Sequence, residues 1–170
     1  SLKKTTGITS EVVPNGHRLG EVAEQYKDSI LWVARSAEFK RPGFFIELAK
    51  KNPEHSFVMV CQKATGDKNY DKLVTYARQI SNLDFYEGVE FSKIEDFFAR
   101  AKIFVNTSRS EGCANTYIQA CKHGAAILSL EVDPDNFIER NSCGVCCGGD
   151  VDRLQKGLDR LLAGDRYIEF

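Results

Sequence analysis

The sequence predicts an α/β fold of the Rossmann-like type, in which a six-stranded parallel sheet lies between two layers of helices. Two observations support this fold class. Short apolar runs alternate along the whole chain with stretches of helical periodicity, which favours a parallel sheet covered by helices. The runs are also apolar throughout, as in strands buried on both faces. For a chain of 170 residues we expect the strand order 3-2-1-4-5-6, with a ligand crevice between the first and fourth strands.

The expected elements follow one another regularly from residue 30. The apolar runs predict strands at 30–34, 57–61, 83–86, 103–105, 126–130 and 144–147. Between and after them, apolar residues recur at three- and four-residue spacing and predict helices at 42–49, 73–80, 94–101, 117–121, 134–141 and 151–162. Pro42 is expected to open the first of these helices, because its fixed φ suits the first helical position.

The composition excludes several classes of protein. A hydrophobic content of 42% and a charged content of 28% are ordinary for a globular domain. A net charge of −1 argues against broad nucleic-acid binding. We see neither an apolar run near the roughly 18 residues that a membrane span needs nor a signal peptide. We therefore expect a cytoplasmic protein.

The cysteines allow two interpretations. Cys143, Cys146 and Cys147 have a spacing that could hold zinc, but a structural zinc site needs further ligands. The three histidines are scattered without metal-like spacing. Most of the cysteines lie in or beside apolar runs, which favours buried free thiols in a reducing compartment.

Two loops are expected to meet at the crevice. The expected strand at 103–105 passes into a small, polar stretch and then a helix, and the backbone N–H groups at such a helix start bind anions. Arg35 and Lys40 lie in the loop after the first strand, so two cations face these donors and form a diphosphate pocket. Glu111 is interpreted either as a hydroxyl-binding group there or as a charge that only complements the helix dipole.

Several motifs then indicate a family. Arg35 follows the strand expected at 30–34, and Lys40 lies five residues later. Residues 111–124 read E-G-C-A-N-T-Y-I-Q-A-C-K-H-G, and residues 13–16 read V-P-N-G. Together they resemble the motifs of GT-B glycosyltransferases of the family-four retaining type. The resemblance extends over residues 12–162 and includes V-D-P-D at 132–135 and the closing leucine-rich helix.

The resemblance implies a domain organisation and an activity. Residues 29–170 would form the C-terminal, donor-binding domain of a two-domain enzyme, and residues 1–28 the interdomain connection and lead-in. An N-terminal domain would hold the acceptor and make any peripheral membrane contact. The enzyme would transfer a sugar from a nucleotide sugar such as a UDP- or GDP-hexose with retention, in polysaccharide or glycolipid biosynthesis, without a metal or other cofactor. No nucleic-acid partner is expected.

The resemblance also implies roles for individual residues. Arg35 and Lys40 would hold the diphosphate, and with Glu111, which would bond to sugar hydroxyls, they form the predicted catalytic set. The further donor contacts would come from Gly88 and Val89 at the base, from Gln119 at the ribose, and from the backbone of Gly112, Cys113, Ala114, Asn115 and Thr116.

The sequence departs from the family pattern at three positions. Gln119 stands where the motif has a second glutamate, Ala34 where it has a glycine, and Cys113 where it has a phenylalanine. An amide bonds to a ribose hydroxyl, but without the charge assistance of a carboxylate. Gln119 therefore leaves open a non-catalytic nucleotide-sugar-binding subunit. A nucleotide-sugar epimerase of the same architecture is the other alternative, although it would need acid/base residues that the chain does not plainly offer.

Overall fold

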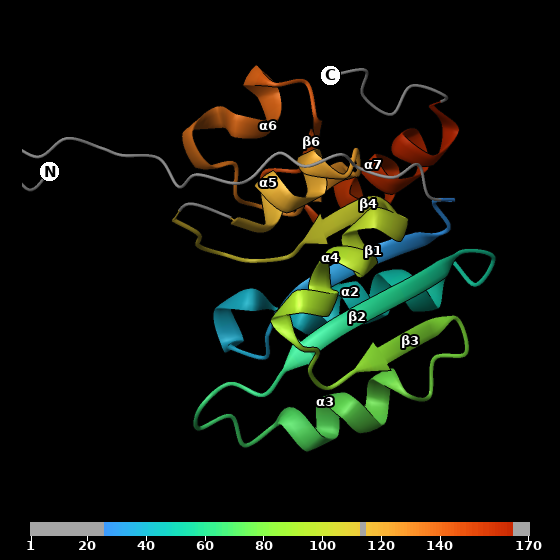
Figure 1. Ribbon diagram of the computed structural model, residues 1–170, viewed down its shortest axis with the longest axis vertical. Helices are drawn as coiled ribbons and strands as arrows, with labels where there is room; N and C mark the ends of the chain where they lie inside the picture. The colour runs from blue at the N-terminus through green and yellow to red at the C-terminus, as the bar shows by residue number, and fades with distance from the viewer. Residues whose placement is uncertain (1–25, 113–114, 165–170) are drawn as a thin grey trace, which may run out of the picture.

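The chain forms a parallel sheet between two helical layers. The computed structural model describes residues 26–112 and 115–164. The strand order is β3-β2-β1-β4-β5-β6, with every pair parallel, so the predicted fold class and strand order are confirmed (Figure 1). In chain order the elements are β1 (Ser29–Arg35), η1 (Glu38–Lys40), α2 (Pro42–Lys51), β2 (Ser56–Gln62), α3 (Tyr70–Ala77), β3 (Leu83–Tyr86), η2 (Phe91–Lys93), α4 (Ile94–Arg100), β4 (Ala101–Asn106), α5 (Asn115–Lys122), β5 (Ala126–Ser129), η3 (Pro134–Asn136), α6 (Phe137–Arg140), β6 (Gly144–Cys146) and α7 (Val151–Ala163).

Some expectations fall outside the described residues. These are the V-P-N-G connection at residues 13–16, most of the lead-in, and the two donor-binding candidates Cys113 and Ala114.

One expected element differs in the structure: the predicted helix at 134–141 is divided into η3 and α6. Asp135 and Asn136 both have φ of 54°, and this left-handed backbone interrupts a right-handed helix.

Helices cover both faces of the sheet. Helices α2, α3 and α7 pack with the strands into one apolar cluster, and α4, α5 and α6 pack into a second one on the opposite face. In Figure 1, α4 lies in front of the strands and α2 behind them. Burying the strands on both faces explains why their sequences are apolar throughout.

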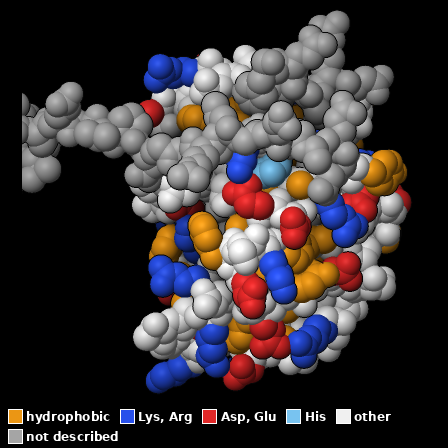
Figure 2. Space-filling view, in the orientation of Figure 1, with side chains coloured by type: hydrophobic (Ala, Val, Ile, Leu, Met, Phe, Trp, Pro, Cys, Tyr) orange, Lys and Arg blue, Asp and Glu red, His pale blue; other side chains and the backbone are white. Residues whose placement is uncertain are grey.

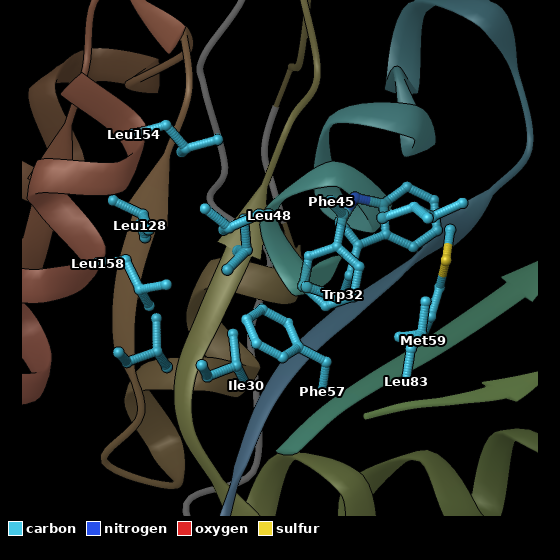
Figure 3. Close-up of a cluster of buried hydrophobic side chains, with 14 of the residues drawn as sticks. Ile30, Trp32, Phe45, Leu48, Phe57, Met59, Leu83, Leu128, Leu154 and Leu158 are labelled. Atoms are coloured by element: carbon cyan, nitrogen blue, oxygen red, sulfur yellow. The ribbon is translucent and has the colours of Figure 1, made fainter. Parts of the chain in front are cut away.

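Aromatic side chains fill the space between β1, β2 and α2. The ring of Phe45 lies 6.4 Å from that of Trp32 and 5.5 Å from that of Phe57, measured between centroids (Figure 3). Met59 is fully buried near them. This packing fixes the end of β1, and therefore the loop that carries Arg35 and Lys40, against the sheet.

Two glycines allow close packing at the other side of the sheet. A Cβ on Gly144 would lie 1.9 Å from the carbonyl oxygen of Ile127, its register partner on β5. A Cβ on Gly157 of α7 would lie 2.7 Å from a methyl carbon of Leu128. Both positions therefore need glycine for β6 and α7 to approach β5 this closely.

Acidic and basic side chains are interspersed on the face that carries α4 and α5 (Figure 2). This mixture gives that face no field of a single sign that would attract a polyanion. Within residues 26–112 and 115–164, no helix has the length and apolar character to cross a membrane.

Candidate functional site

A cavity of about 460 Å³ lies where the strand order reverses, between β1 and β4. Its walls come from the ends of β1, β2 and β4 and from the loops that follow β1, β3 and β4. They include Trp32, Ala34, Arg35, Lys40, Gln62, Gly88, Val89, Phe91, Ile94, Asn106, Ser108, Glu111 and Thr116. The crevice that the strand order predicts is therefore present as a cavity, at the carboxyl ends of the strands.

The structure brings most of the described candidate residues to this cavity. Those that line it are Arg35, Lys40, Gly88, Val89, Glu111 and Thr116. Gly112 instead lines a neighbouring cavity of about 350 Å³, between α5 and α6. Asn115 is exposed at the first residue of α5. Gln119 is 8% exposed, and it is not one of the residues that line the main cavity.

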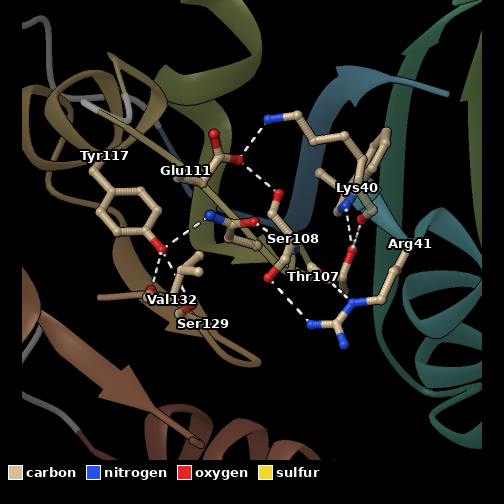
Figure 4. Close-up of polar contacts among 10 residues, drawn as sticks. Lys40, Arg41, Thr107, Ser108, Glu111, Tyr117, Ser129 and Val132 are labelled. Atoms are coloured by element: carbon tan, nitrogen blue, oxygen red, sulfur yellow. Dashed lines mark hydrogen bonds and ion pairs between the residues drawn. The ribbon is translucent and has the colours of Figure 1, made fainter. Parts of the chain in front are cut away.

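Lys40 and Glu111 are paired across the cavity. The Nζ atom of Lys40 donates to Oε1 of Glu111 at 2.5 Å, and the hydroxyl of Ser108 donates to the same oxygen at 2.6 Å (Figure 4). The side chains of Lys40 and Glu111 are only 20% and 16% exposed. Glu111 is thus more than a complement to the helix dipole, because it is a bonding partner of the opposite loop.

Arg35 differs from Lys40 in its surroundings. It is the last residue of β1, and its side chain is exposed while it lines the cavity. The sequence predicts that both cations face the helix start, whereas the structure pairs Lys40 with a carboxylate and leaves Arg35 exposed. Arg35 is therefore the more accessible cation for an anionic ligand.

A buried polar network supports the floor of the cavity. The side-chain amide of Asn106 donates to the hydroxyl of Tyr117 at 2.9 Å, and its carbonyl oxygen accepts from the N–H of Ser108 at 2.8 Å. The Tyr117 hydroxyl lies 2.8 Å from the carbonyl oxygen of Val132 and 3.0 Å from the Ser129 hydroxyl (Figure 4). Burial raises the pKa of Tyr117, although the bonds with Ser129 and Asn106 oppose this change. The tyrosine is therefore a neutral, fixed hydroxyl.

Sequence reasoning missed this network and a second contact beside it. Tyr117 was expected only as an apolar position of its helix. Trp32, expected only as part of a buried strand, donates its indole N–H to the Thr107 hydroxyl at 3.0 Å, and Thr107 donates to the carbonyl oxygen of Lys40 at 2.6 Å. The available signal was the residue type, since buried tyrosine and tryptophan usually find a polar partner.

The cavity has an apolar section opposite its polar loops. Gly88 and Val89 follow β3, and Phe91 and Ile94 come from η2 and the start of α4. The Phe91 side chain is 87% exposed although it borders the cavity. A flat, uncharged ring could lie against this section.

The cysteines and histidines do not form a metal site in the described residues, where no group of three or more His, Cys, Asp or Glu side chains could hold a metal. The Cys143 thiol lies 3.8 Å from the carbonyl oxygen of Ile138, and the Cys146 thiol lies 3.6 Å from that of Glu131. Cys147 is buried, and burial raises its pKa to about 11. These contacts agree with free thiols in and beside a short strand.

The comparison with protein families now gives the family. The sequence model of the family described as Glycosyl transferases group 1 matches residues 9–164. The chain belongs to this family. Its fold is that of a GT-B glycosyltransferase domain, as the resemblance of the motifs predicts. No curated protein matches the sequence.

Solved structures share the fold at low sequence identity. A mutant of S. aureus TarM, in complex with Fondaparinux, alpha-GlcNAc-glycerol and UDP, has a TM-score of 0.75 at 17% identity, with 96% of this chain and 35% of TarM covered. WaaG, a glycosyltransferase involved in lipopolysaccharide biosynthesis, has a TM-score of 0.64 at 20% identity, with 84% of this chain and 40% of WaaG covered. An E. coli structure described as trehalose-6-phosphate bound with UDP-2-fluoro glucose has a TM-score of 0.64 at 14% identity, with 81% and 36% covered. The chain thus spans less than half of each neighbour.

Proposed function

We propose that residues 29–170 form the nucleotide-sugar-binding domain of a retaining glycosyltransferase. The observation that carries the proposal is that Arg35, Lys40 and Glu111 line the same cavity as Gly88 and Val89. A nucleotide sugar requires cations for its diphosphate, a hydrogen-bond acceptor for its sugar hydroxyl groups and an apolar section for its base. The family and the UDP-containing neighbours support this assignment.

In this proposal the donor occupies the cavity and its margin. Arg35 and Lys40 bind the diphosphate, and the base lies against Gly88 and Val89. The backbone of residues 112–116 would complete the phosphate and sugar site and Gln119 would contact the ribose, although Thr116 lines the cavity whereas Gly112 and Gln119 do not. Glu111 accepts from a sugar hydroxyl through Oε2, because the bonds from Lys40 and Ser108 both go to Oε1.

The pairing of Lys40 with Glu111 is compatible with phosphate binding. An ammonium group has three donors, so Lys40 can keep Glu111 and still donate to a phosphate oxygen. During transfer, negative charge grows on the departing phosphate, and fixed cations placed there stabilise the transition state. Arg35, Lys40 and the start of α5 would supply this potential without a metal ion.

A test of nucleotide binding decides the proposal. The chain should show a higher Tm and a calorimetric binding signal with one of UDP, GDP or ADP, and EDTA should leave the affinity unchanged. Arg160→Ala is a matched control for substitutions of Arg35, because Arg160 is exposed on α7 and does not line the cavity. If no nucleoside diphosphate or nucleotide sugar binds, the proposed function is wrong.

The proposal includes a second, acceptor-binding domain, joined through residues 1–28, and hexosyl transfer in polysaccharide or glycolipid biosynthesis at the inner face of a membrane. We expect the 170-residue chain alone to bind donor weakly and to transfer nothing, because it is open to water and does not position an acceptor. Positioning two reactants contributes roughly 7–11 kcal/mol to lowering a barrier. Labelled nucleotide sugar and a crude acceptor extract should therefore give no product, and multiple turnover would contradict the two-domain organisation.

One observation favours a second candidate, a non-catalytic nucleotide-sugar-binding subunit. The position of the motif's second glutamate is occupied by Gln119, which is buried on α5 and does not line the main cavity. Turnover by the full-length protein with donor and acceptor would separate the two functions, since only an enzyme releases nucleoside diphosphate continuously.

A further inference from the structure

Arg41 has an unusual backbone conformation next to the cavity. It lies between η1 and α2, with φ and ψ both at 50°. This left-handed conformation is sterically unfavourable for a residue with a Cβ and is commonly adopted by glycine. Contacts made by the Arg41 side chain must therefore compensate for the strain.

The Arg41 guanidinium joins three loops. Its Nε donates to the carbonyl oxygen of Thr107 at 2.7 Å, and its Nη2 donates to the carbonyl oxygen of Ser108 at 3.1 Å (Figure 4). Nη2 also lies 2.7 Å from Oε2 of Glu131, and the guanidinium carbon lies 5.5 Å from the centre of the Phe44 ring. One planar fork thus connects the loop before α2 with the loops after β4 and β5, which a lysine could not do with the same geometry.

These bonds fix the backbone on both sides of Ser108. The N–H of Ser108 donates to Asn106, and the N–H of Arg109 donates to the carbonyl oxygen of Phe39 at 2.8 Å. Arg41 donates to the carbonyl oxygens of Thr107 and Ser108. In each of the two peptide groups that flank Ser108, both the C=O and the N–H are therefore hydrogen-bonded. The Ser108 side chain is therefore held in a defined direction.

That direction leads to Glu111. The Ser108 hydroxyl donates to Glu111 Oε1 at 2.6 Å, so the chain of bonds runs from Arg41 through the Ser108 backbone to the carboxylate. Arg41 itself is not one of the residues that line the cavity. Its side chain therefore acts on the cavity through the loops that it holds.

We infer that Arg41 is a positioning residue that places Glu111 for the hydroxyl group of a sugar bound in the cavity. The inference rests on the proposed function in that the sugar belongs to a nucleotide-sugar donor. It adds a role that neither the phosphate-binding cations nor the carboxylate supplies: the rigid support that determines where the carboxylate lies.

The substitution Arg41→Gly tests this role without changing the backbone. Glycine adopts φ near 50° freely, so the variant should fold while it loses all contacts of the guanidinium. Amide hydrogen exchange at Ser108 and Arg109 should become about tenfold faster or more, because their loop opens more easily. The amide of Val60 in β2 should not change.

Two further variants refine the test. Glu131→Gln keeps both bonds from Arg41 to the carbonyl groups and removes only the ion pair, so exchange at Ser108 should change much less than in Arg41→Gly. Arg41→Lys keeps the charge but not the planar fork and should resemble Arg41→Gly. It also serves as the test variant if the glycine protein does not fold.

Calorimetry then measures the effect on the ligand. The parent should bind a nucleotide sugar more tightly than the corresponding nucleoside diphosphate, and Arg41→Gly should lose about fivefold or more of this preference while its affinity for the diphosphate stays within about twofold. Unchanged exchange, or faster exchange with the preference intact, would overturn the inference. If the parent binds no nucleotide, the proposed function is wrong, and so is the role of Arg41 in positioning a sugar-binding carboxylate. If the parent binds and Arg41→Gly has no effect, only the inference about Arg41 is wrong.

Discussion

Two polar clusters of the molecule have similar chemistry and different surroundings. At the carboxyl edge of the sheet, one oxygen of Glu111 accepts from Lys40 and from Ser108. Between α4 and α5, one oxygen of Glu95 lies 2.8 Å from Nζ of Lys122 and 2.5 Å from Nε2 of His123. Each cluster therefore joins a carboxylate to a lysine and to one further polar side chain.

Their positions in the fold separate them. Glu111 borders the cavity at the point where the strand order reverses, and its side chain is 16% exposed. Glu95 joins α4 to the end of α5, and its side chain is 37% exposed. The composition of an ion pair therefore does not define a site: the crossover topology supplies the cavity that Lys40 and Glu111 border, where the proposed donor would bind.

The largest expected effect belongs to the exposed cation at the carboxyl edge. Arg35→Ala should weaken the binding of the nucleoside diphosphate by about 1.5–3 kcal/mol, the range for a hydrogen bond with a charged group. Its Tm without ligand should stay close to that of the parent, since Arg35 is exposed. Isothermal calorimetry with Arg160→Ala as control measures this, and equal affinities of Arg35→Ala and parent would remove Arg35 from the site.

A matched pair of substitutions tests most directly whether the two clusters differ in function. Glu111→Gln should weaken binding of the nucleotide sugar by about 1 kcal/mol, because an amide accepts a hydroxyl bond without charge assistance. Glu95→Gln should leave that affinity unchanged and lower the Tm instead. The same loss of affinity in both variants would mean that the two clusters are not functionally distinct.

The fold could be predicted from sequence because its signals are local. The run at 30–34 is apolar on both faces, and Pro42 marks the start of α2; both features are visible without knowledge of the partners. The strand order then follows from general rules of topology, and it brought Arg35 and Glu111 to one cavity correctly.

The support of the site could not be predicted in the same way. The bond between Lys40 and Glu111 depends on the positions of two side chains far apart in the chain, and the left-handed backbone of Arg41 depends on contacts with Thr107 and Ser108. Pro42 gave a partial signal, because the residue before a proline avoids the right-handed helical region. Nothing local indicated which carbonyl groups the Arg41 side chain would reach.

Helix α5 connects the two clusters, and Gln119 lies between them in the sequence of this helix. The first turn of α5 carries Thr116 at the cavity, and its last residue is Lys122 of the Glu95 cluster. Because Gln119 is 8% exposed, we expect Gln119→Glu to destabilise the free protein by about 1 kcal/mol, through burial of a carboxyl group. If Gln119 contacts the ribose as proposed, a saturating nucleotide should recover this loss, because the carboxylate accepts ribose hydroxyl bonds more strongly.

Thermal unfolding of Gln119→Glu with and without nucleotide measures this compensation. The parent gives the reference shift in Tm caused by ligand, and the variant should show a larger one. A smaller shift in the variant would mean that the amide's donor capacity is needed at this position, and that the ribose contact has been assigned to the wrong residue.

The smallest expected effect is a pH dependence that belongs to the Glu95 cluster. Burial by itself would raise the pKa of Glu95, but hydrogen bonds and charge from Lys122 and His123 outweigh burial and lower it from 4.5 to about 2. A carboxyl group with a lowered pKa in the folded state contributes stability above its unfolded pKa, and this contribution is lost as the pH falls from about 4.5 towards 2.

Because the Glu95 side chain is 37% exposed, solvent screening limits the contribution to about 0.2–1 kcal/mol. The Tm of Glu95→Gln should therefore lie at most about 2–4 °C below that of the parent at pH 7, and the difference should shrink between pH 4.5 and 2. Glu111→Gln is the control from the other cluster, and a difference for Glu95→Gln that stays constant over this pH range would show that Glu95 acts through packing rather than through its charge.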